Sequence, residues 1–307
     1  MRPYGGLALG AMTLFTAGCL SLRPYDQAVH GLPAADLLSI DGRRVHAPST
    51  GTGQPLLLLH GFGGSTVMWD AVVPRLAATR RVVAIDLNGF GYTERPAAPD
   101  AYTIGGQAAL VLAVADRLGI GRFDVAGHSY GGGIALWLAA HHPERVRSLI
   151  LVDNALPAYG VLRRQSFYSS RLLIRFAVHT FALSDSRIRH GLREAYADER
   201  RVTPELVRAY ADRLRIEGAV DAFHGLVAPN GQAPDEVDLA ALSQPTLVVW
   251  GSGDKLIPVA EGERRAREIP HATFRTLEGC GHNPMEECPD AFVERVAPFL
   301  AAVATLP

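Results

Sequence analysis

The chain has 307 residues, of which 48% are hydrophobic and 20% are charged, and its formal net charge is −1. These values are typical of a globular protein, and they exclude a disordered chain or a polytopic membrane protein. A net charge near zero gives no support to nucleic-acid binding, which usually needs a basic face. With only three cysteines, a disulfide framework or a multi-cysteine metal site is excluded as well.

The first residues have the pattern of a bacterial export signal. The window 3–22 carries no charge and follows Arg2, and its apolar part is diluted by glycine and threonine. It is short and weakly apolar for a membrane-spanning helix, and is more typical of the apolar region of a signal peptide. It ends in Thr-Ala-Gly-Cys at residues 16–19, which resembles the lipobox, where small residues precede a cysteine that becomes lipidated.

This resemblance implies a signal peptide at 1–18 and an acylated Cys19, in a lipoprotein of the bacterial cell envelope that a lipid anchor holds at a membrane. Leu20 follows the cysteine, and a residue other than Asp there favours the outer membrane. The alternatives are an ordinary signal peptide, which would leave a periplasmic or secreted soluble protein, and an uncleaved anchor. Residues 19–35 contain proline and glycine without a clear period, so we expect a tether there.

From Asp36 onward the chain has regular patterns. Asp41-Gly42 between two short segments predicts a β-hairpin. Helical patterns alternate with continuous apolar runs, which are typical of strands buried on both faces. The expected strands are 56–59, 81–86, 123–126, 146–152 and 246–250, and the expected helices are 67–78, 107–118 and 132–141. This alternation predicts an α/β fold with a mostly parallel central sheet and helices on both faces.

The alternation is interrupted between Val152 and Thr246 by a segment of helical character. Thr203-Pro204 within it has the pattern of a helix start. An insertion at this point predicts a helical cap over the carboxyl edge of the sheet. We therefore divide the chain into a first core part, a helical cap and a second core part, at 36–155, 156–243 and 244–307. The arginine-rich stretch 163–193 is interpreted as a solvated helix face; the alternative is contact with an anionic membrane or an acidic substrate.

Gly127-His128-Ser129-Tyr130-Gly131 matches the pattern Gly-x-Ser-x-Gly. It follows an expected strand and opens an expected helix, which is the arrangement of a nucleophile elbow. The sharp turn forces Ser129 into strained backbone angles, and only small residues at Gly127 and Gly131 avoid clashes. We therefore predict that Ser129 is a nucleophile. The alternative is a glycine-rich turn in which the serine is only a helix cap.

A second glycine-rich loop, His60-Gly61-Phe62-Gly63-Gly64-Ser65, follows the strand 56–59. Such a loop presents backbone N–H groups to a developing negative charge. We predict that the backbone N–H groups of Phe62 and Tyr130 form an oxyanion hole, and that His60 and Gly61 support the loop. A phosphate-binding loop is the alternative, but Gly-Lys-Ser/Thr is lacking.

A serine nucleophile needs a base, and the base needs an acid that orients it. His282 lies in a glycine-rich loop beyond the last expected strand, and Asp254 follows the strand 246–250. We predict that they complete a catalytic triad with Ser129. Asp153, which ends the strand 146–152, is the alternative acid. Because no His or Cys cluster has the spacing of metal ligands, we predict neither a metal nor a cofactor.

These motifs, in this order, resemble the α/β-hydrolase superfamily over residues 36–303. The sequences His-Gly-Phe-Gly-Gly-Ser, Gly-His-Ser-Tyr-Gly-Gly, Gly-Ser-Gly-Asp and Gly-Cys-Gly-His carry the resemblance. It implies that the cap is inserted after strand 6 of the sheet. Members of this fold that open epoxides or remove halogens use an aspartate nucleophile, so Ser129 excludes those reactions. The chain is similar to the serine esterase and lipase-like branch.

For that branch the resemblance implies hydrolysis of a carboxylic ester through an acyl-enzyme, with a small-molecule or lipid-like ester as substrate. One alternative is a carbon–carbon bond hydrolase of diketone-type substrates, in which Arg163, Arg164 or Arg171 of the cap would hold an anionic group. A second alternative is a non-catalytic envelope binding protein on the same fold. Whether Cys280 and Cys288 pair also stays open, because the Gly-Cys-Gly-His sequence is common in relatives without a disulfide.

Overall fold

The computed structural model describes residues 22–154, 183–227 and 237–305. Its centre is a seven-stranded sheet of order β3-β5-β4-β6-β7-β8-β9, in which β3 is antiparallel to β5 and all other neighbours are parallel. This confirms the predicted α/β fold with a mostly parallel sheet. The strands are β3 (Ser49–Thr50), β4 (Gln54–Leu59), β5 (Arg80–Ile85), β6 (Phe123–His128), β7 (Val146–Val152), β8 (Thr246–Gly251) and β9 (Thr273–Leu277), and β1 (Leu37–Ile40) and β2 (Arg43–His46) form the predicted hairpin beside it.

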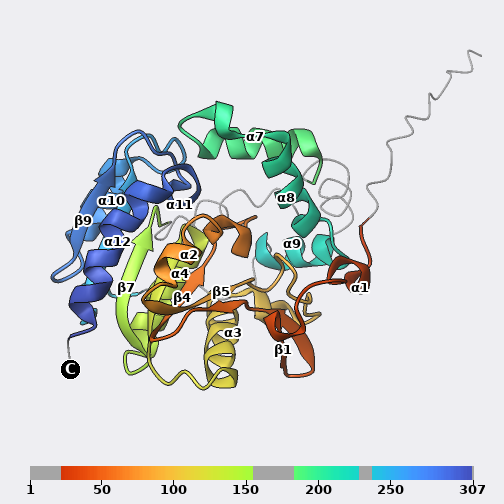
Figure 1. Cartoon of the computed structure of the whole chain (residues 1–307), viewed down its shortest axis with the longest axis horizontal. Coiled ribbons are helices and arrows are strands. Elements are labelled where there is room, and N and C mark those ends of the chain that lie inside the picture. The colour runs from red at the N-terminus through yellow and green to blue at the C-terminus, as the bar shows by residue number, and fades with distance from the viewer. Residues whose placement is uncertain (1–21, 155–182, 228–236, 306–307) are drawn as a thin grey trace, which may run out of the picture.

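Helices pack on both faces of the sheet and over one end of it (Figure 1). The described α-helices are α1 (Tyr25–Ala28), α2 (Val73–Leu76), α3 (Ile104–Arg117), α4 (Tyr130–His141), α7 (Asp185–Ala195), α8 (Pro204–Leu214), α9 (Ala219–Val227), α10 (Val259–Ala266), α11 (Pro284–Glu287) and α12 (Pro289–Val303). Short 3₁₀ turns are η1 (Ala34–Asp36), η2 (Thr66–Trp69), η3 (Pro99–Tyr102), η5 (Glu199–Arg201) and η6 (Leu239–Ala241).

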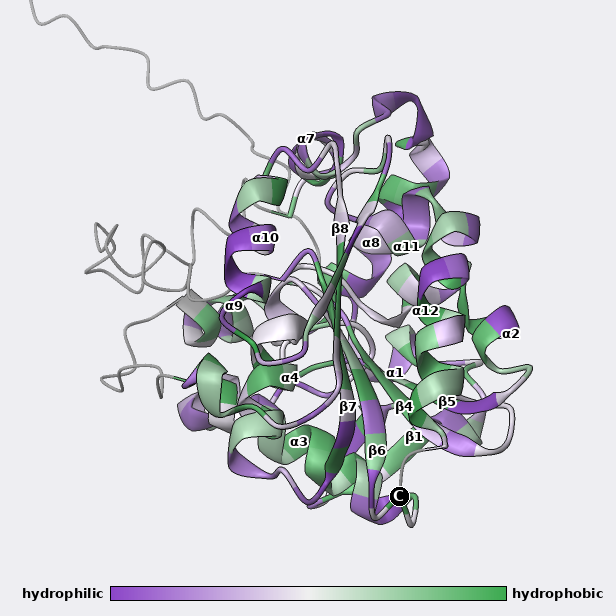
Figure 2. Cartoon of the chain, turned by 90° about the vertical axis from the view of Figure 1, so that its left-hand side faces the viewer, coloured by the Kyte–Doolittle hydropathy of each residue, from purple (hydrophilic) through white to green (hydrophobic). Residues whose placement is uncertain are grey.

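Consecutive residues of the central strands point to opposite faces, and both faces are buried. Leu57 and Leu59 of β4 belong to a core formed with α3, α4 and α10, whereas Leu56 and Leu58 belong to a core formed with α2 and α12. Figure 2 views the sheet edge-on and shows these two helical layers on either side. Because helices cover both faces, the strands are continuous apolar runs rather than alternating ones.

The described part of the cap consists of α7, α8 and α9, which lie over one end of the sheet (Figure 1). These helices come from the chain between β7 and β8, where the sequence predicted a helical insertion. Helix α8 begins at Pro204, and the hydroxyl oxygen of Thr203 accepts the N–H of Leu206 at 3.2 Å, so the predicted helix start is confirmed.

The predicted helix over 67–78 is divided in the structure into η2 and α2. Pro74 lies in the first turn of α2 and has no N–H to donate to the preceding turn. A continuous α-helix therefore cannot run through this position, whereas a new helix tolerates proline in its first turn.

Residues 22–33, here called the N-terminal strap, connect the cap to the core. The backbone N–H of Arg23 donates to the carbonyl of Arg215 at 2.9 Å, and its carbonyl accepts the N–H of Glu217 at 2.9 Å. On the core side, the hydroxyl of Tyr25 donates to the carbonyl of Tyr92 at 2.8 Å. The strap is therefore fixed to the chain between α8 and α9 at one point and to the core at another.

The sequence predicted a tether over 19–35, but the described part of this segment is packed. Tyr25, Ala28 and Val29 are buried in a small apolar cluster with Ile216 of the cap. Apolar burial explains the difference, since a tether would leave these side chains in water. The predicted signal peptide and Cys19 lie outside the described residues. In the ranges that the structure describes, no helix is both long and apolar enough to cross a membrane.

Candidate active site

Ser129 occupies the sharp turn between β6 and α4. Its backbone has φ 46° and ψ −109°, a strained conformation for a residue other than glycine. A Cβ on Gly127 would lie 2.3 Å from the carbonyl oxygen of Gly131, and a Cβ on Gly131 would lie 2.4 Å from that of Leu59. The turn therefore closes only with glycine at both positions. Ser129 itself is partly exposed, as a nucleophile must be.

His282 and Asp254 form a buried pair at the same end of the sheet. Nδ1 of His282 lies 2.7 Å from Oδ2 of Asp254. Oδ1 of Asp254 accepts the backbone N–H groups of Leu256 and Ile257 at 2.8 and 2.9 Å. Because a carboxylate only accepts, the Nδ1 hydrogen of His282 is donated to it, and Nε2 stays available to accept a proton from a nucleophile.

His128 joins His282 to the elbow. Its Nε2 donates to the backbone carbonyl of His282 at 2.8 Å, and the two rings lie 4.9 Å apart. Burial, and then the neighbouring His282, hold the pKa of His128 well below its ordinary value. His128 directly precedes Ser129, so this bond fixes the histidine loop against the elbow. Apart from the position of His128 in the Gly-x-Ser-x-Gly pattern, no sequence signal indicated this role.

The loop predicted to hold the oxyanion lies against the nucleophile. A Cβ on Gly61 would lie 2.6 Å from Nδ1 of His128 and 3.3 Å from Cβ of Ser129. Nδ1 of His60 donates to the carbonyl of Gly61 at 2.7 Å, and its Nε2 accepts the N–H of Leu87 at 3.0 Å. His60 is buried, which lowers its pKa, so it acts here as a neutral support of the loop.

The predicted oxyanion donors, Phe62 and Tyr130, border the same space from two elements. Tyr130 is the first residue of α4, and the first N–H groups of a helix point out of its N-terminal end. The Phe62 ring makes edge contacts with Tyr130, Phe90 and Phe223, with centroids 6.3, 5.4 and 5.9 Å apart. Phe62 remains 43% exposed, so an aromatic surface that includes cap helix α9 adjoins the nucleophile.

Asp86 braces the start of η2, directly after the oxyanion loop. Its carboxylate accepts the N–H groups of Thr66 and Tyr92 at 2.6 and 2.8 Å and pairs with Nδ1 of His46 at 2.7 Å. Burial alone would raise its pKa, but the charge and hydrogen bond of His46 together with the N–H donor lower it well below the ordinary value. Asp86 directly follows β5, so its carboxylate ties the end of that strand to the two neighbouring loops.

The cap holds the histidine loop directly. The N–H of His282 donates to the carbonyl of Ala195 at the end of α7, at 2.6 Å. The Glu287 carboxylate accepts the N–H of Gly281 at 2.5 Å and that of Asp198 at 2.7 Å. Glu287 therefore links the loop of His282 to the segment after α7. Sequence reasoning missed this role of Glu287, because its partner Asp198 is distant along the chain.

Cys280 and Cys288 are joined by a disulfide bond, with their Cα atoms 6.0 Å apart. This settles in the structure a pairing that the sequence left open. The bond encloses His282 and α11 in a small covalent loop. The histidine is therefore held by three kinds of constraint, namely the disulfide, the backbone bond to Ala195 and the bond from His128.

Asp153, the alternative acid, ends β7 and is completely buried near the pair. His282 donates to Asp254 and not to Asp153. Among the described residues, Asp153, Asp254 and His282 are the one group of His, Cys, Asp and Glu atoms close enough to share a metal ion, within 4.8 Å of one another. The 2.7 Å bond between His282 and Asp254 already occupies two of these atoms, which suits a catalytic pair better than a metal centre.

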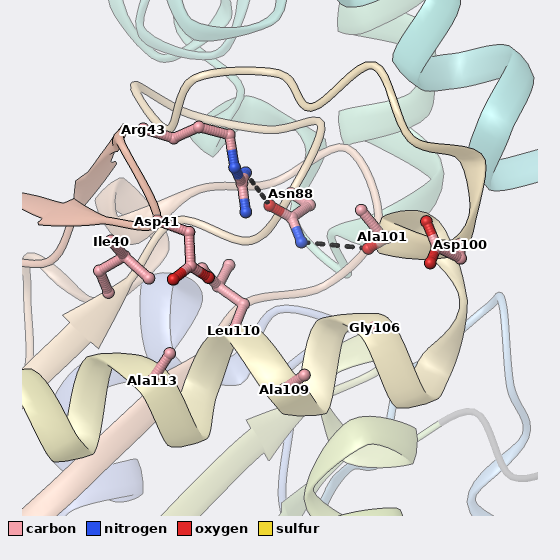
Figure 3. A pocket seen from close by; sticks show the side chains of 10 residues that line it. All are labelled: Ile40, Asp41, Arg43, Asn88, Asp100, Ala101, Gly106, Ala109, Leu110 and Ala113. Atoms are coloured by element: carbon pink, nitrogen blue, oxygen red, sulfur yellow. Dashed lines mark hydrogen bonds between the residues drawn. The ribbon is translucent and has the colours of Figure 1, made fainter.

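A surface pocket of about 220 Å³ lies elsewhere, between the β1–β2 hairpin and α3 (Figure 3). Nη1 of Arg43 donates to Asn88 at 3.1 Å, and the Asn88 amide donates to the carbonyl of Ala101 at 3.0 Å. Its lining includes no member of the predicted triad or oxyanion loop. We therefore assign it no part in catalysis.

Three cap residues proposed for anion binding, Arg163, Arg164 and Arg171, lie outside the described residues.

Comparison with known proteins gives a consistent result. A sequence model of the alpha/beta hydrolase fold matches residues 54–289. The 2-hydroxymuconate semialdehyde hydrolase of Pseudomonas putida is 34% identical over 274 residues, which cover 86% of this chain and 93% of that protein.

Two solved structures extend the comparison. A meta-cleavage product hydrolase from Pseudomonas fluorescens is 25% identical, with a TM-score of 0.72, and the match covers 87% of this chain and 97% of that one. A bacterial membrane phospholipase A is 29% identical, with a TM-score of 0.68, and the match covers 88% of this chain and 86% of that one.

Proposed function

The chain belongs to the alpha/beta hydrolase fold family, and on this premise we propose that it is a serine hydrolase that cleaves a carbon–carbon bond beside a carbonyl group in a diketone-type substrate. The observation that carries the proposal is the His282–Asp254 pair beside the Ser129 elbow in a chain 34% identical to 2-hydroxymuconate semialdehyde hydrolase. The sequence motifs favoured ester hydrolysis, whereas this relative favours the carbon–carbon alternative.

In the proposed reaction Ser129 attacks the carbonyl carbon while Nε2 of His282 takes the serine proton. The backbone N–H groups of Phe62 and Tyr130 stabilise the oxyanion. The carbon–carbon bond then breaks, its electron pair stays on the leaving carbon, and His282 delivers the proton there. Water attacks the remaining acyl-enzyme, adds its hydroxyl to the acyl carbon and returns one proton to the serine oxygen.

A carbon leaving group restricts the substrate more than an alcohol does. The electron pair left on carbon needs delocalisation into a second, conjugated carbonyl group, which a diketone or its enol tautomer provides. The compound for which the relative is named, 2-hydroxymuconate semialdehyde, is a conjugated hydroxy acid that ends in an aldehyde. The aromatic surface at Phe62 and Phe223 supports this proposal, since it suits the apolar part of a conjugated chain.

The test compares two substrate classes on one purified enzyme. We expect wild type to consume 2-hydroxymuconate semialdehyde, with formate and a shortened hydroxydienoate as products, and Ser129→Ala to be slower by about 10⁴-fold or more. A series of p-nitrophenyl esters is measured in parallel. Rapid turnover of esters together with an inert semialdehyde would overturn the carbon–carbon assignment and leave the serine mechanism in place.

Ester hydrolysis is the second candidate, and one observation favours it. The membrane phospholipase A matches this chain over 88% of its length at 29% identity. The same triad would then release an alcohol instead of a carbon acid, with no other change in the residues used. A non-catalytic role fits less well, because the histidine is paired with its acid, the serine is strained, and His128, next to the serine, binds the carbonyl of His282.

We also propose that the chain is exported and that Cys19 carries a lipid. The Thr-Ala-Gly-Cys sequence supports lipidation, and the Cys280–Cys288 disulfide supports an oxidising compartment, since such bonds rarely persist in the cytosol. Expression in a bacterial host with labelled fatty acid tests this. Label on wild type but not on Cys19→Ser is expected, and a protein that stays unlabelled in the soluble cytosolic fraction would refute it.

A further inference from the structure

The structure contains a second buried carboxyl group behind the catalytic pair. Asp153 follows β7 with a φ of 41° and is 0% exposed. Its Oδ1 accepts the backbone N–H of Gly251 at 3.0 Å. Its Oδ2 is fully buried, and no hydrogen-bond donor in the described part of the chain reaches it. A buried polar oxygen without a donor is rare and needs a physical reason.

The neighbouring carboxyl group is that of Asp254. One side-chain oxygen of each aspartate and a ring nitrogen of His282 lie within 4.8 Å of one another. Two carboxylates only accept hydrogen bonds, so they stabilise each other only when one of them carries a proton. At such a distance inside a protein, two negative charges would repel strongly.

The hydrogen bonds decide which aspartate keeps its charge. Asp254 accepts two backbone N–H groups and the Nδ1 hydrogen of His282. Asp153 accepts a single N–H group, from Gly251. Hydrogen bonds to the charged form favour ionisation, so the proton belongs on Asp153. In agreement, burial and then the charge of Asp254 raise the pKa of Asp153 well above its ordinary value.

We propose that Asp153 is a neutral carboxylic acid whose hydroxyl donates a hydrogen bond to Asp254, as a positioning residue that extends the triad to four members. The inference rests on the triad of the proposed function but not on which bond is cleaved. The titratable groups facing Asp153 are Asp254 after β8 and His282 after β9, with His128 of β6 behind the latter. The arrangement leaves one negative charge beside His282 and fixes the orientation of the carboxylate that carries it.

Three variants test the role of Asp153. Asp153→Asn replaces the hydroxyl by an amide that can still donate to Asp254, and asparagine tolerates positive φ. Its kcat/KM should stay within about threefold of wild type, and the acid limb of its pH profile should move by less than about 0.2 pH unit. Asp254→Asn is the matched change on the neighbouring acid. Its kcat/KM should fall by about 10³- to 10⁴-fold.

Asp153→Ala removes the donor altogether. The Asp254 carboxylate then holds more negative charge and stabilises the imidazolium of His282 more strongly. We expect the acid limb of the pH profile to move upward by about 0.5–1 pH unit, and kcat to fall by about tenfold. Loss of folding stability alone would lower the amount of active enzyme without moving this limb, and thermal unfolding of each variant measures that loss separately.

An infrared difference spectrum of wild type against Asp153→Asn gives a direct readout. The carbonyl band of a protonated carboxylic acid, which a carboxylate lacks, is expected in wild type and absent from the variant. Three results would each overturn the proposal. They are the absence of that band, a downward shift of the acid limb in Asp153→Asn, and a loss of kcat/KM in Asp153→Asn as large as that in Asp254→Asn. Failure of a fluorophosphonate probe to label Ser129 would refute the proposed function instead, and the infrared result would still decide the state of Asp153.

Discussion

The hydroxyl of Tyr210 donates a hydrogen bond to the carboxyl group of Glu286 at 2.7 Å, and so joins cap helix α8 to helix α11 just after His282. The side-chain amide of Asn283 donates to the same oxygen at 2.9 Å. Burial raises the pKa of Glu286 to about 7, against the opposing effect of these hydrogen bonds. A contact between the cap and the histidine loop therefore titrates near neutral pH.

This raised pKa predicts a pH-dependent stability. The folded protein keeps a proton on Glu286 that the unfolded chain releases near the ordinary value of 4.5. The contribution is therefore fully present below pH 4.5 and is lost as the pH rises to about 7, on the order of 3 kcal/mol in the free energy of unfolding. Glu286→Gln, which stays neutral, should flatten this decline in urea unfolding between pH 5 and 8.

The exposed Glu278 lies in the segment that leads to the same loop, so Glu278→Gln is the matched control. It should retain the pH dependence of wild type. An unchanged slope in Glu286→Gln would show that other groups cause the decline.

Reduction of the Cys280–Cys288 disulfide should loosen the loop that carries His282. A crosslink that closes so short a loop is worth about 2–3 kcal/mol in the free energy of unfolding. The double variant Cys280→Ala/Cys288→Ala should lose that amount, together with part of its kcat. Wild type in dithiothreitol should match the double variant, and dithiothreitol should have no effect on the double variant itself. Equal melting temperatures for wild type with and without reductant would contradict the prediction.

Gly61→Ala should damage the oxyanion loop. The new Cβ would lie 2.6 Å from Nδ1 of His128, so the loop has to move away from the elbow. A displaced Phe62 N–H no longer meets the oxyanion, and kcat should fall by about 100-fold with KM little changed. Gly121→Ala is the control, because no atom lies within 4 Å of its added Cβ. Equal activity of the two variants would argue against the predicted oxyanion role of this loop.

Tyr25→Ala should release the N-terminal strap. The ring of Tyr25 is buried in a cluster with Ile216, and its hydroxyl binds the carbonyl of Tyr92. Removing the ring should lower the free energy of unfolding by about 3 kcal/mol, whereas Tyr25→Phe, which keeps the ring, should lose about 1 kcal/mol. Thermal unfolding measures both. Similar losses in the two variants would mean that the hydrogen bond, and not the packing, holds the strap.

Short sequence patterns predicted the elements whose conformation depends on residues close together in the chain. The Asp41-Gly42 hairpin was predictable because both residues adopt the positive φ that this turn requires, 49° and 76°. The buried strands and the elbow were predictable from apolar runs and glycine spacing. Strand β9 was not predicted, since it lies at the sheet edge and Arg275 within it is exposed, so its apolar signal is weak.

The supporting contacts of the candidate site, made by Glu287 and Asp153, join residues that are distant along the chain. Glu287 binds the N–H of Asp198, and Asp153 lies beside Asp254 across two strands. No spacing in the sequence reports such pairs, because they arise only when the cap and the sheet edge come together. The packed strap escaped prediction for the same reason, since its buried residues find their partners on the cap.

The attachment of the strap also limits how the molecule can be oriented at a surface. A fully extended chain from Cys19 to Arg23 reaches at most about 14 Å. Arg23 is already bound to the cap through Arg215 and Glu217. A lipid on Cys19 would thus tether the molecule to a membrane close to its cap, because the strap binds the cap at Arg23.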